Sequence, residues 1–175
     1  GEGAFLTIAT ERIICGALRK NFSEKHIKQL LEKNIVGFDI DREAVERCKN
    51  NLDQVAKKHS INNIQWQIYQ ADSLNMEFVT PFFKKFDFVV GNPPYVRIQH
   101  LGKEKREEIQ QKWQFCQNGS TDIFIAFFEL GIRLLSERGK LGYITPNTFL
   151  KTKAGESLRR FLRDANILKT LIDFE

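Results

Sequence analysis

The fold of this chain is decided by one short stretch, which reads Phe86-Asp87-Phe88-Val89-Val90-Gly91-Asn92-Pro93-Pro94-Tyr95. Its first half, residues 86–90, is apolar and rich in β-formers, and it predicts a buried strand. The strand must stop at the two prolines, because proline lacks a backbone N–H and restricts the residue before it. The stretch therefore predicts a strand that ends abruptly in a rigid loop.

The loop 92–95 has the chemistry needed to hold an amino group. Two successive prolines remove two donors and leave rigidly aimed backbone carbonyls as acceptors. Asn92 adds a side-chain carbonyl, and Tyr95 adds a flat face for stacking. Two acceptors on one conjugated amine would pull its N–H groups out of plane and localise the lone pair toward an electrophile. The alternative interpretation is a plain strand stop and turn.

Helical and strand patterns alternate along the chain, which predicts an α/β domain with a mostly parallel sheet and helices on both faces. No repeat or linker interrupts residues 1–175, so they are interpreted as one domain. We expect helices at 3–20, 24–33, 42–55, 122–137 and 157–163, and strands at 35–38, 64–69, 86–90, 141–145 and 167–174. Residues 103–112 are interpreted as a solvated helix or mobile lid, with DNA-backbone contact as the alternative.

Two of the predicted strands lead into aspartates, Asp39 and Asp72. Ligands of open α/β sheets bind outside the carboxyl ends of the strands. A carboxylate there can accept hydrogen bonds from ribose hydroxyls or from an adenine amine. Gly1 and Gly3 precede the first helix, where glycine allows close approach of a ligand to the backbone. The alternatives are an ordinary glycine turn and helix capping by each aspartate, and Asp41 is assigned a capping role.

The composition excludes several classes of protein. The 175 residues are 42% hydrophobic and 28% charged, which is typical of a globular chain, and the net charge of +5 permits a polyanionic partner. No apolar run approaches the roughly 20 residues of a membrane span. Three cysteines without a C-x-x-C pair argue against disulfides and a zinc site, and suit a cytoplasmic location. His26, His59 and His100 share no ligand spacing, so we expect surface histidines and no metal.

Several segments, taken in chain order, resemble the successive motifs of S-adenosylmethionine-dependent amino-methyltransferases. They are Gly1-Glu2-Gly3-Ala4-Phe5-Leu6, Gly37-Phe38-Asp39-Ile40-Asp41, Ala71-Asp72 and Gly91-Asn92-Pro93-Pro94-Tyr95. Within that superfamily the chain is most similar to the N6-adenine DNA methyltransferases of type IIG restriction–modification enzymes and their type I relatives. Residues 121–135 and 139–150 extend the likeness over essentially the whole chain.

The resemblance implies a Rossmann-like class I methyltransferase fold with S-adenosylmethionine as cofactor. Gly1 and Gly3 would line the methionine part of the cofactor. Asp39 would hold its ribose hydroxyls, and Asp72 its adenine amine. Phe127 would pack on the cofactor adenine, with a purely structural role in the core as the alternative.

The resemblance also implies the substrate, which is a flipped adenine in double-stranded DNA. Asn92 and the Pro93 carbonyl would bind the target amine, Pro94 would line the same loop, and Tyr95 would stack on the target base. The methyl group would pass directly to N6, without a general base acting before transfer.

The chain departs from the family at both ends. The family's first motif begins with an Asp-Pro-type segment on a central strand, and that segment does not precede Gly1. The final hairpin strand, a second aromatic residue for the base, and a target-recognition domain are also missing. We therefore expect residues 1–175 to be a partial catalytic domain of a larger enzyme. The target-recognition domain and any nuclease domain would lie outside these residues.

Three rival interpretations stay open. An RNA base or a protein glutamine amide would suit the same Asn-Pro-Pro-Tyr loop. A second rival is a DNA- or protein-interaction module that has lost its cofactor. A third, a nicotinamide-dependent oxidoreductase, is weakened because Leu6 occupies a position where the dinucleotide fingerprint needs a small residue.

Overall fold

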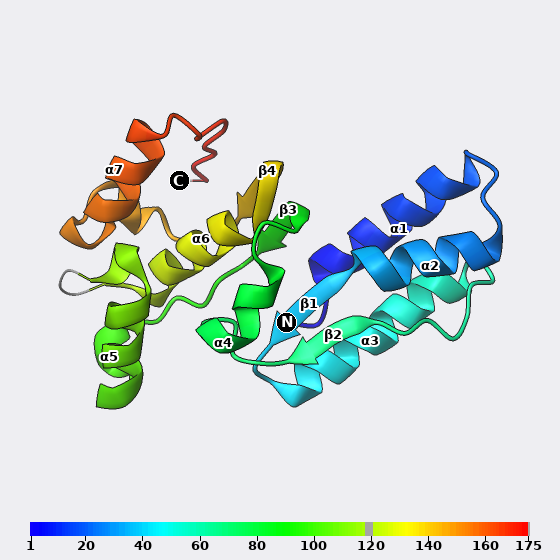
Figure 1. Ribbon diagram of the computed structural model, residues 1–175, viewed down its shortest axis with the longest axis horizontal. Helices are drawn as coiled ribbons and strands as arrows, with labels where there is room; N and C mark the ends of the chain where they lie inside the picture. The colour runs from blue at the N-terminus through cyan, green and yellow to red at the C-terminus, as the bar shows by residue number, and fades with distance from the viewer. Residues whose placement is uncertain (118–120, 175) are drawn as a thin grey trace. The chain divides into compact units, whose positions relative to one another are not determined.

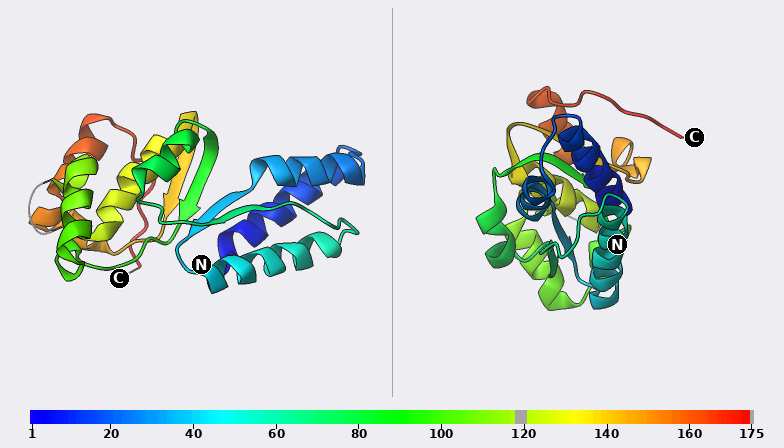
Figure 2. Two further views of the ribbon diagram at one scale, coloured as in Figure 1. Left: turned by 60° about the horizontal axis from the view of Figure 1, so that its bottom comes forward. Right: turned by 90° about the vertical axis from the view of Figure 1, so that its right-hand side faces the viewer.

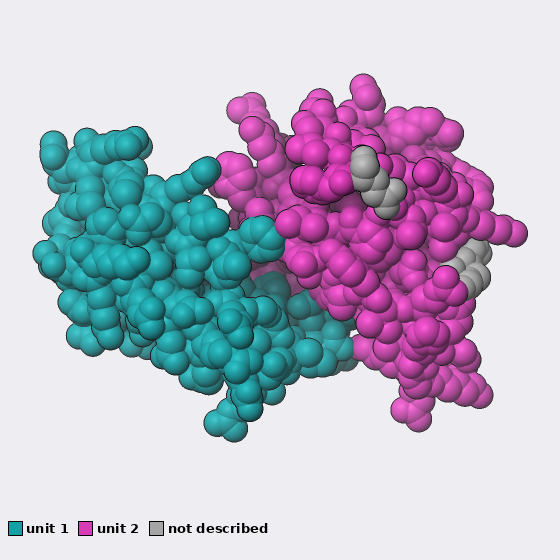
Figure 3. All heavy atoms as spheres, turned by 180° about the vertical axis from the view of Figure 1, so that it is seen from behind, with its two compact units in different colours: residues 1–78 teal, residues 79–175 magenta. Residues whose placement is uncertain are grey.

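The computed structural model describes residues 1–117 and 121–174. The chain divides into two compact units, Gly1–Phe78 and Val79–Glu175 (Figure 3). Each unit has its own two-stranded parallel sheet. Helices and parallel strands alternate in both units, which confirms the α/β class. The Rossmann-like strand order, the missing strands and the interpretation as one domain stay predictions.

The first unit is built around the parallel pair β1 and β2 (Figure 1). Its elements are α1 (Ala4–Leu18), α2 (Glu24–Asn34), β1 (Val36–Asp39), α3 (Arg42–Lys57) and β2 (Gln67–Gln70). Asp39 lies opposite Gln70 at the carboxyl end of the pair. The helix α1 packs against both α2 and α3. Because α3 connects the two strands, this unit is a strand–helix–strand crossover, as the sequence predicts.

The helices of this unit form where amphipathic patterns and caps predict them. Ser23 accepts a hydrogen bond from the His26 backbone N–H at 3.3 Å and caps α2. Asp41 accepts one from the Glu43 backbone N–H at 2.9 Å, which confirms its capping role on α3. The apolar side of α3 enters the core through Ala44, Val45, Cys48, Leu52 and Ala56.

Gly3 has a left-handed backbone conformation at the start of α1. Its φ of +86° lies in the left-handed region, where side chains are disfavoured. A Cβ atom added there would come within 2.6 Å of the Cys48 Sγ atom. The packing of α1 on α3 therefore requires glycine at this position.

The second unit contains the parallel pair β3 and β4, which the left view of Figure 2 shows as the green and yellow arrows. Its helices and strands are β3 (Phe86–Gly91), α5 (Lys103–Lys112), α6 (Ile123–Leu134), β4 (Leu135–Tyr143) and α7 (Glu156–Asp164). The short helix α4 (Met76–Val79) spans the boundary between the units. Short 3-10 helices cover Thr80–Phe82, Ile98–His100, Gln114–Cys116, Asn147–Leu150 and Lys153–Gly155.

The boundary between α6 and β4 differs from the prediction. The helix ends at Leu134 instead of at the Arg138-Gly139-Lys140 segment, and the strand begins at Leu135 instead of at residue 141. The backbone N–H groups of Lys84 and Lys85 donate to the carbonyls of Arg133 and Leu134, at 2.9 and 3.0 Å. The segment before β3 thus satisfies the last helical carbonyls and ends the helix early.

Two strand predictions are corrected. The strand β3 exists, but it is not fully buried, because Phe88 and Val90 are 71% and 48% exposed. Residues 167–174 are predicted to form a last strand, yet this segment has no regular secondary structure and its apolar side chains are exposed. A strand needs a neighbouring strand to pair with, and none of the strands in the described part of the chain pairs with this segment.

The polar segment 103–112 forms the solvated helix α5, as the sequence predicts. Glu108 accepts hydrogen bonds from Lys105 and Lys112, both at 3.0 Å, which lower the pKa of its carboxyl group. The completely buried Ile109 attaches this charged helix to the unit. Within the described chain, no helix has the length and apolarity to cross a membrane.

Candidate active site

The first unit brings Gly1 and Asp39 together at the carboxyl end of β1. The Asp39 carboxylate, 23% exposed, lies against the backbone nitrogen of Gly1. Its other oxygen accepts the Asp41 backbone N–H at 2.9 Å. Asn51 donates to the Glu2 carbonyl at 3.0 Å and holds the turn between the two glycines against α3. The glycine turn and the first predicted ribose ligand therefore lie side by side.

Asp72 lies at the same edge of this sheet. The Ala71 backbone N–H donates to the Asp39 carbonyl at 2.8 Å, so the chain leaving β2 runs directly beside the end of β1. The half-buried Asp72 accepts the Leu74 backbone N–H at 2.8 Å and closes a tight turn. Two half-buried carboxylates thus lie at the carboxyl edge of the pair, where ligands of α/β sheets bind. Their geometry suits a ligand that carries hydroxyl or amino donors.

The second unit presents the Asn92–Tyr95 loop at the carboxyl end of β3. Pro93 is buried, whereas Asn92, Pro94 and Tyr95 are exposed. The Tyr95 hydroxyl donates to the Asn92 side-chain oxygen at 2.5 Å and lies 3.4 Å from the Ile144 carbonyl. A carbonyl oxygen has two lone pairs, so Asn92 can accept a second donor. The loop offers an aimed amide oxygen next to an aromatic ring that is 55% exposed.

The chain leaving this loop is fixed to the start of α6. Ile98 donates its backbone N–H to the Thr121 carbonyl at 2.9 Å, and Ile123 donates to the Val96 carbonyl at 2.8 Å. Arg97 and Asp122 form the antiparallel bridge between these bonds. Asp122 occupies the N-cap position of α6, as predicted, but its side chain makes no capping hydrogen bond. This bridge fixes the chain just after the loop 92–95.

Phe127 lies on α6 and is half-buried, so part of its surface is available to a ligand. Its carbonyl accepts the Tyr143 hydroxyl at 3.2 Å, and burial raises the pKa of that hydroxyl. The neighbouring rings Phe124, Phe128, Tyr143 and Phe149 pack together as the aromatic core of this unit. The alternatives left open for Phe127, cofactor packing and a core role, both stay predictions.

Sequence reasoning missed a buried ionic network in the second unit. Glu129, only 4% exposed, accepts the Phe115 backbone N–H at 2.9 Å and is ion-paired with Arg133. The Arg133 guanidinium lies over the Trp113 ring, 5.4 Å from its centroid. Burial, and then the Glu129 charge, raise the pKa of the Cys116 thiol to about 12. The i,i+4 spacing of Glu129 and Arg133 is the one sequence signal for this pair.

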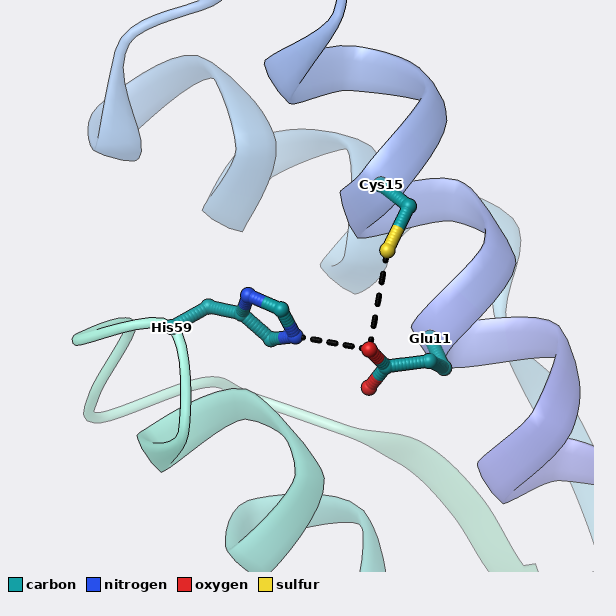
Figure 4. Close-up of side chains that lie close together, drawn as sticks. All are labelled: Glu11, Cys15 and His59. Atoms are coloured by element: carbon teal, nitrogen blue, oxygen red, sulfur yellow. Dashed lines mark hydrogen bonds and ion pairs between the residues drawn. The ribbon is translucent and has the colours of Figure 1, made fainter.

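A second missed group is the cluster of Glu11, Cys15 and His59 in the first unit (Figure 4). Glu11 Oε1 lies 2.9 Å from His59 Nε2 and 3.5 Å from Cys15 Sγ. The hydrogen bond to His59 lowers the pKa of Glu11, whereas burial raises that of Cys15. His26 and His100 are exposed as expected, but His59 is half-buried, because it packs against α1.

The predicted site residues fall into both units. Gly1, Gly3, Asp39 and Asp72 gather in the first unit, and the loop 92–95 and Phe127 belong to the second. Asp39, Asp72 and the loop 92–95 lie at or just after the carboxyl ends of parallel strands, whereas Gly1 and Gly3 precede α1 and Phe127 lies on α6.

These features define an α/β chain with polar side chains at the carboxyl ends of parallel strands, which is the arrangement of a ligand-binding enzyme domain. The Eco57I restriction-modification methylase family matches residues 33–175. The chain therefore belongs to this family, which confirms the resemblance derived from the motifs.

Individual relatives agree with this assignment. The type II methyltransferase M.BstVI from Geobacillus stearothermophilus is 30% identical over 179 residues, covering 99% of this chain and 32% of that protein. The type II restriction enzyme and methyltransferase RM.Eco57I from Escherichia coli is 38% identical over 93 residues, covering 51% of this chain and 9% of that protein. The type II methyltransferase M.AccI from Acinetobacter calcoaceticus is 28% identical over 157 residues, covering 88% of this chain and 27% of that protein. The chain thus spans a third or less of the length of these relatives.

Proposed function

We propose that this chain is part of the catalytic domain of a DNA methyltransferase, and that it transfers a methyl group from S-adenosylmethionine to N6 of a flipped adenine. The observation that carries the proposal is the Asn92–Tyr95 loop, an exposed amide oxygen and aromatic ring at the end of a parallel strand. Membership of a restriction-modification methylase family supports DNA as the substrate. The N6 specificity rests on the resemblance of the motifs.

The donor set of the first unit fits the proposed cofactor. Asp39 and Asp72 supply two half-buried carboxylates at one sheet edge, and within residues 1–117 and 121–174 no cationic side chain forms an ion pair with Asp39. These carboxylates suit a cofactor that has ribose hydroxyls, an adenine amine and a cationic centre, and that carries no phosphates. Asp39 would hold the hydroxyls, and the Gly1–Gly3 turn would admit the aliphatic part. When bound, the cofactor supplies an electrophilic methyl group on a sulfonium.

Asn92 and Pro93 would prepare the target amine for attack. The Asn92 oxygen and the Pro93 carbonyl would each accept one N–H of the adenine amine. This pull would move the nitrogen lone pair out of the ring's conjugation and toward the methyl group. Because the loop is rigid before the base arrives, little reorganisation is needed during transfer. The proton leaves the product nitrogen afterwards, so no side chain with a matched pKa is required.

Tyr95 would hold the flipped base. Taking a base out of the stack costs a few kcal/mol, and stacking on an aromatic ring returns roughly 1–3 kcal/mol per base. The Tyr95 ring is 55% exposed, so its face is accessible. Pro94, exposed beside it, would line the same surface. Recognition of a DNA sequence would come from other segments of the longer protein.

We also propose that the two parallel pairs belong to one Rossmann-like sheet of the class I methyltransferase type. The parallel pairing of β1 with β2 and of β3 with β4 supports this order, as does the location of every proposed ligand-binding strand residue at a carboxyl end. In this proposal a further central strand and a final hairpin strand complete the sheet.

The test is transfer of a labelled methyl group by the full-length protein to duplex DNA, RNA and a glutamine peptide. We expect label in DNA, at adenine N6 after nucleoside digestion. Asn92→Ala and Tyr95→Ala should each lower the transfer rate by roughly 100-fold or more, with cofactor affinity within a few-fold of wild type by calorimetry. Asn50→Ala, an exposed asparagine on α3, is the matched control and should retain wild-type transfer.

Each other outcome contradicts a defined part of the proposal. Label in RNA or in the peptide instead of DNA would show that DNA is not the substrate. Cofactor binding without transfer to any substrate would favour an interaction module. An equal loss of affinity and rate in Asn92→Ala would move Asn92 from the target amine to the cofactor site.

A further inference from the structure

Glu11, Cys15 and His59 bring three chemically different metal-binding atoms to one place (Figure 4). The carboxylate, thiol and imidazole donor atoms all lie within 4.8 Å of one another. Glu11 Oε1 is 2.9 Å from His59 Nε2 and 3.5 Å from Cys15 Sγ. The group belongs to the first unit but uses none of the residues assigned to methyl transfer.

The scaffold holds these three side chains in place before any ligand binds. Glu11 and Cys15 are four residues apart on α1, so they project from the same face of the helix. His59 follows α3, and its backbone N–H donates to the Ala56 carbonyl at 3.0 Å. The helices α1 and α3 are packed on a shared core in which Ile14 and Ala56 are completely buried. Two elements that cannot move apart freely therefore supply the donors.

We propose that Glu11 Oε1, Cys15 Sγ and His59 Nε2 form a binding site for a zinc-type divalent cation. At metal–ligand distances of about 2.0–2.3 Å, tetrahedral ligands are about 3.3–3.6 Å apart. The sulfur–oxygen distance of 3.5 Å already fits, and the nitrogen–oxygen distance of 2.9 Å needs to open by a few tenths of an ångström. Three protein ligands leave the fourth position to water.

The donor types select the metal. A thiol and an imidazole favour borderline-soft ions such as Zn²⁺ and Co²⁺, whereas Mg²⁺ and Ca²⁺ require mostly oxygen ligands. Binding converts the Cys15 thiol to a thiolate and releases its proton to solvent. Because the ligands come from α1 and from the end of α3, the bound ion would fasten these two elements together. An ion that binds only the folded chain stabilises it by mass action.

The competing explanation is a Glu11–His59 pair that also accepts a hydrogen bond from the Cys15 thiol and binds no metal. Cobalt distinguishes the two, because a Co²⁺–thiolate bond produces a charge-transfer absorption band that carboxylate and imidazole ligands do not. We expect titration of the metal-free chain, kept reduced, to develop this band with one equivalent of Co²⁺. Zn²⁺ should then displace the cobalt and bleach the band.

Substitutions locate the site. Cys15→Ser should abolish the band, and Glu11→Gln and His59→Gln should each weaken zinc binding by more than the roughly 10–100-fold that loss of an outer-shell partner costs. His26→Gln is the matched control, an exposed histidine in the same unit, and should bind zinc like wild type. Circular dichroism of each metal-free variant separates loss of binding from loss of folding.

Alkylation of the thiol gives a second measurement on the unmodified sequence. At zinc about one hundred times its Kd, about 1% of sites are empty, so alkylation of Cys15 should slow by up to about 100-fold. The buried Cys48 and Cys116 serve as internal references in the same mass spectrum. An absent charge-transfer band, or zinc binding that persists in the folded Cys15→Ser variant, would overturn the proposal.

Discussion

At Gly3, the backbone conformation and the packing both exclude a side chain. Its φ is +86°, and a Cβ atom would lie 2.6 Å from Cys48 Sγ. We expect Gly3→Ala to lower the free energy of unfolding by about 1–3 kcal/mol, measured by urea denaturation. Gly16→Ala is the matched control in the same helix, where a Cβ atom meets nothing within 4 Å. It should stabilise the chain by up to about 1 kcal/mol, and an equal effect of the two changes would refute the assignment.

Cys116 makes the stability of the chain depend on pH in the alkaline range. Burial and the Glu129 charge raise the pKa of its thiol from 9.0 to about 12. Between these values the unfolded chain loses the proton that the folded chain keeps, so stability falls as the pH rises from about 9 to 12 and is unaffected by this thiol below about 9.

Urea unfolding at about pH 8 and about pH 10.5 tests this expectation. The loss of stability between the two values should be smaller in Cys116→Ala than in wild type, although the alanine variant is less stable at both. Identical losses in the two proteins would show that Cys116 titrates normally in the folded state.

The chemistry of single residues could be predicted where local sequence determines it. The two prolines after Asn92 force a rigid loop at the end of a strand, and the structure has the loop there. His59 is different, because its nearness to Glu11 depends on how α1 packs against α3. Residues 48 positions apart along the chain carry no mutual signal in one sequence. The candidate metal ligands therefore needed the structure.

At the scale of elements, the Glu129–Arg133 pair connects α6 to the segment 113–116. Glu129 is 4% exposed and accepts the Phe115 backbone N–H at 2.9 Å. We expect Glu129→Gln to reduce the free energy of unfolding by about 1–3 kcal/mol, because a neutral amide leaves the half-buried Arg133 guanidinium without its counter-charge. Glu137→Gln, on the exposed part of β4, is the control and should stay within about 0.5 kcal/mol of wild type. Equal unfolding midpoints in the two variants would contradict a structural role for the pair.

The elements that could be predicted are those whose signals are local. The amphipathic repeat of α3 and its Asp41 cap gave the helix almost to the residue. The end of α6 could not be placed, because Lys84 and Lys85, far away in sequence, satisfy its last carbonyls. Residues 167–174 are rich in apolar side chains, as a strand is, yet strand formation also needs a neighbouring strand, which the local sequence does not contain.

At the scale of the whole molecule, β3 exposes a face that a buried strand would hide. Phe88 and Val90 are 71% and 48% exposed, although their sequence is that of a strand covered on both faces. The sequence and the structure agree if residues outside these 175 cover this face in a longer protein, as we propose. The curated relatives, of which this chain spans at most about a third, leave ample length for such a layer.

This interpretation predicts two different costs for one substitution. In the 175-residue chain, Phe88→Ala removes a side chain already in water, so the free energy of unfolding should change by less than about 1 kcal/mol. In the full-length protein the same change should cost about 3–5 kcal/mol, as for a buried phenylalanine. Phe124→Ala, 1% exposed here, should cost about 3–5 kcal/mol in both proteins and calibrates the comparison. Denaturation of both lengths side by side measures the difference, and a small cost of Phe88→Ala in the full-length protein would mean that nothing covers this face of β3.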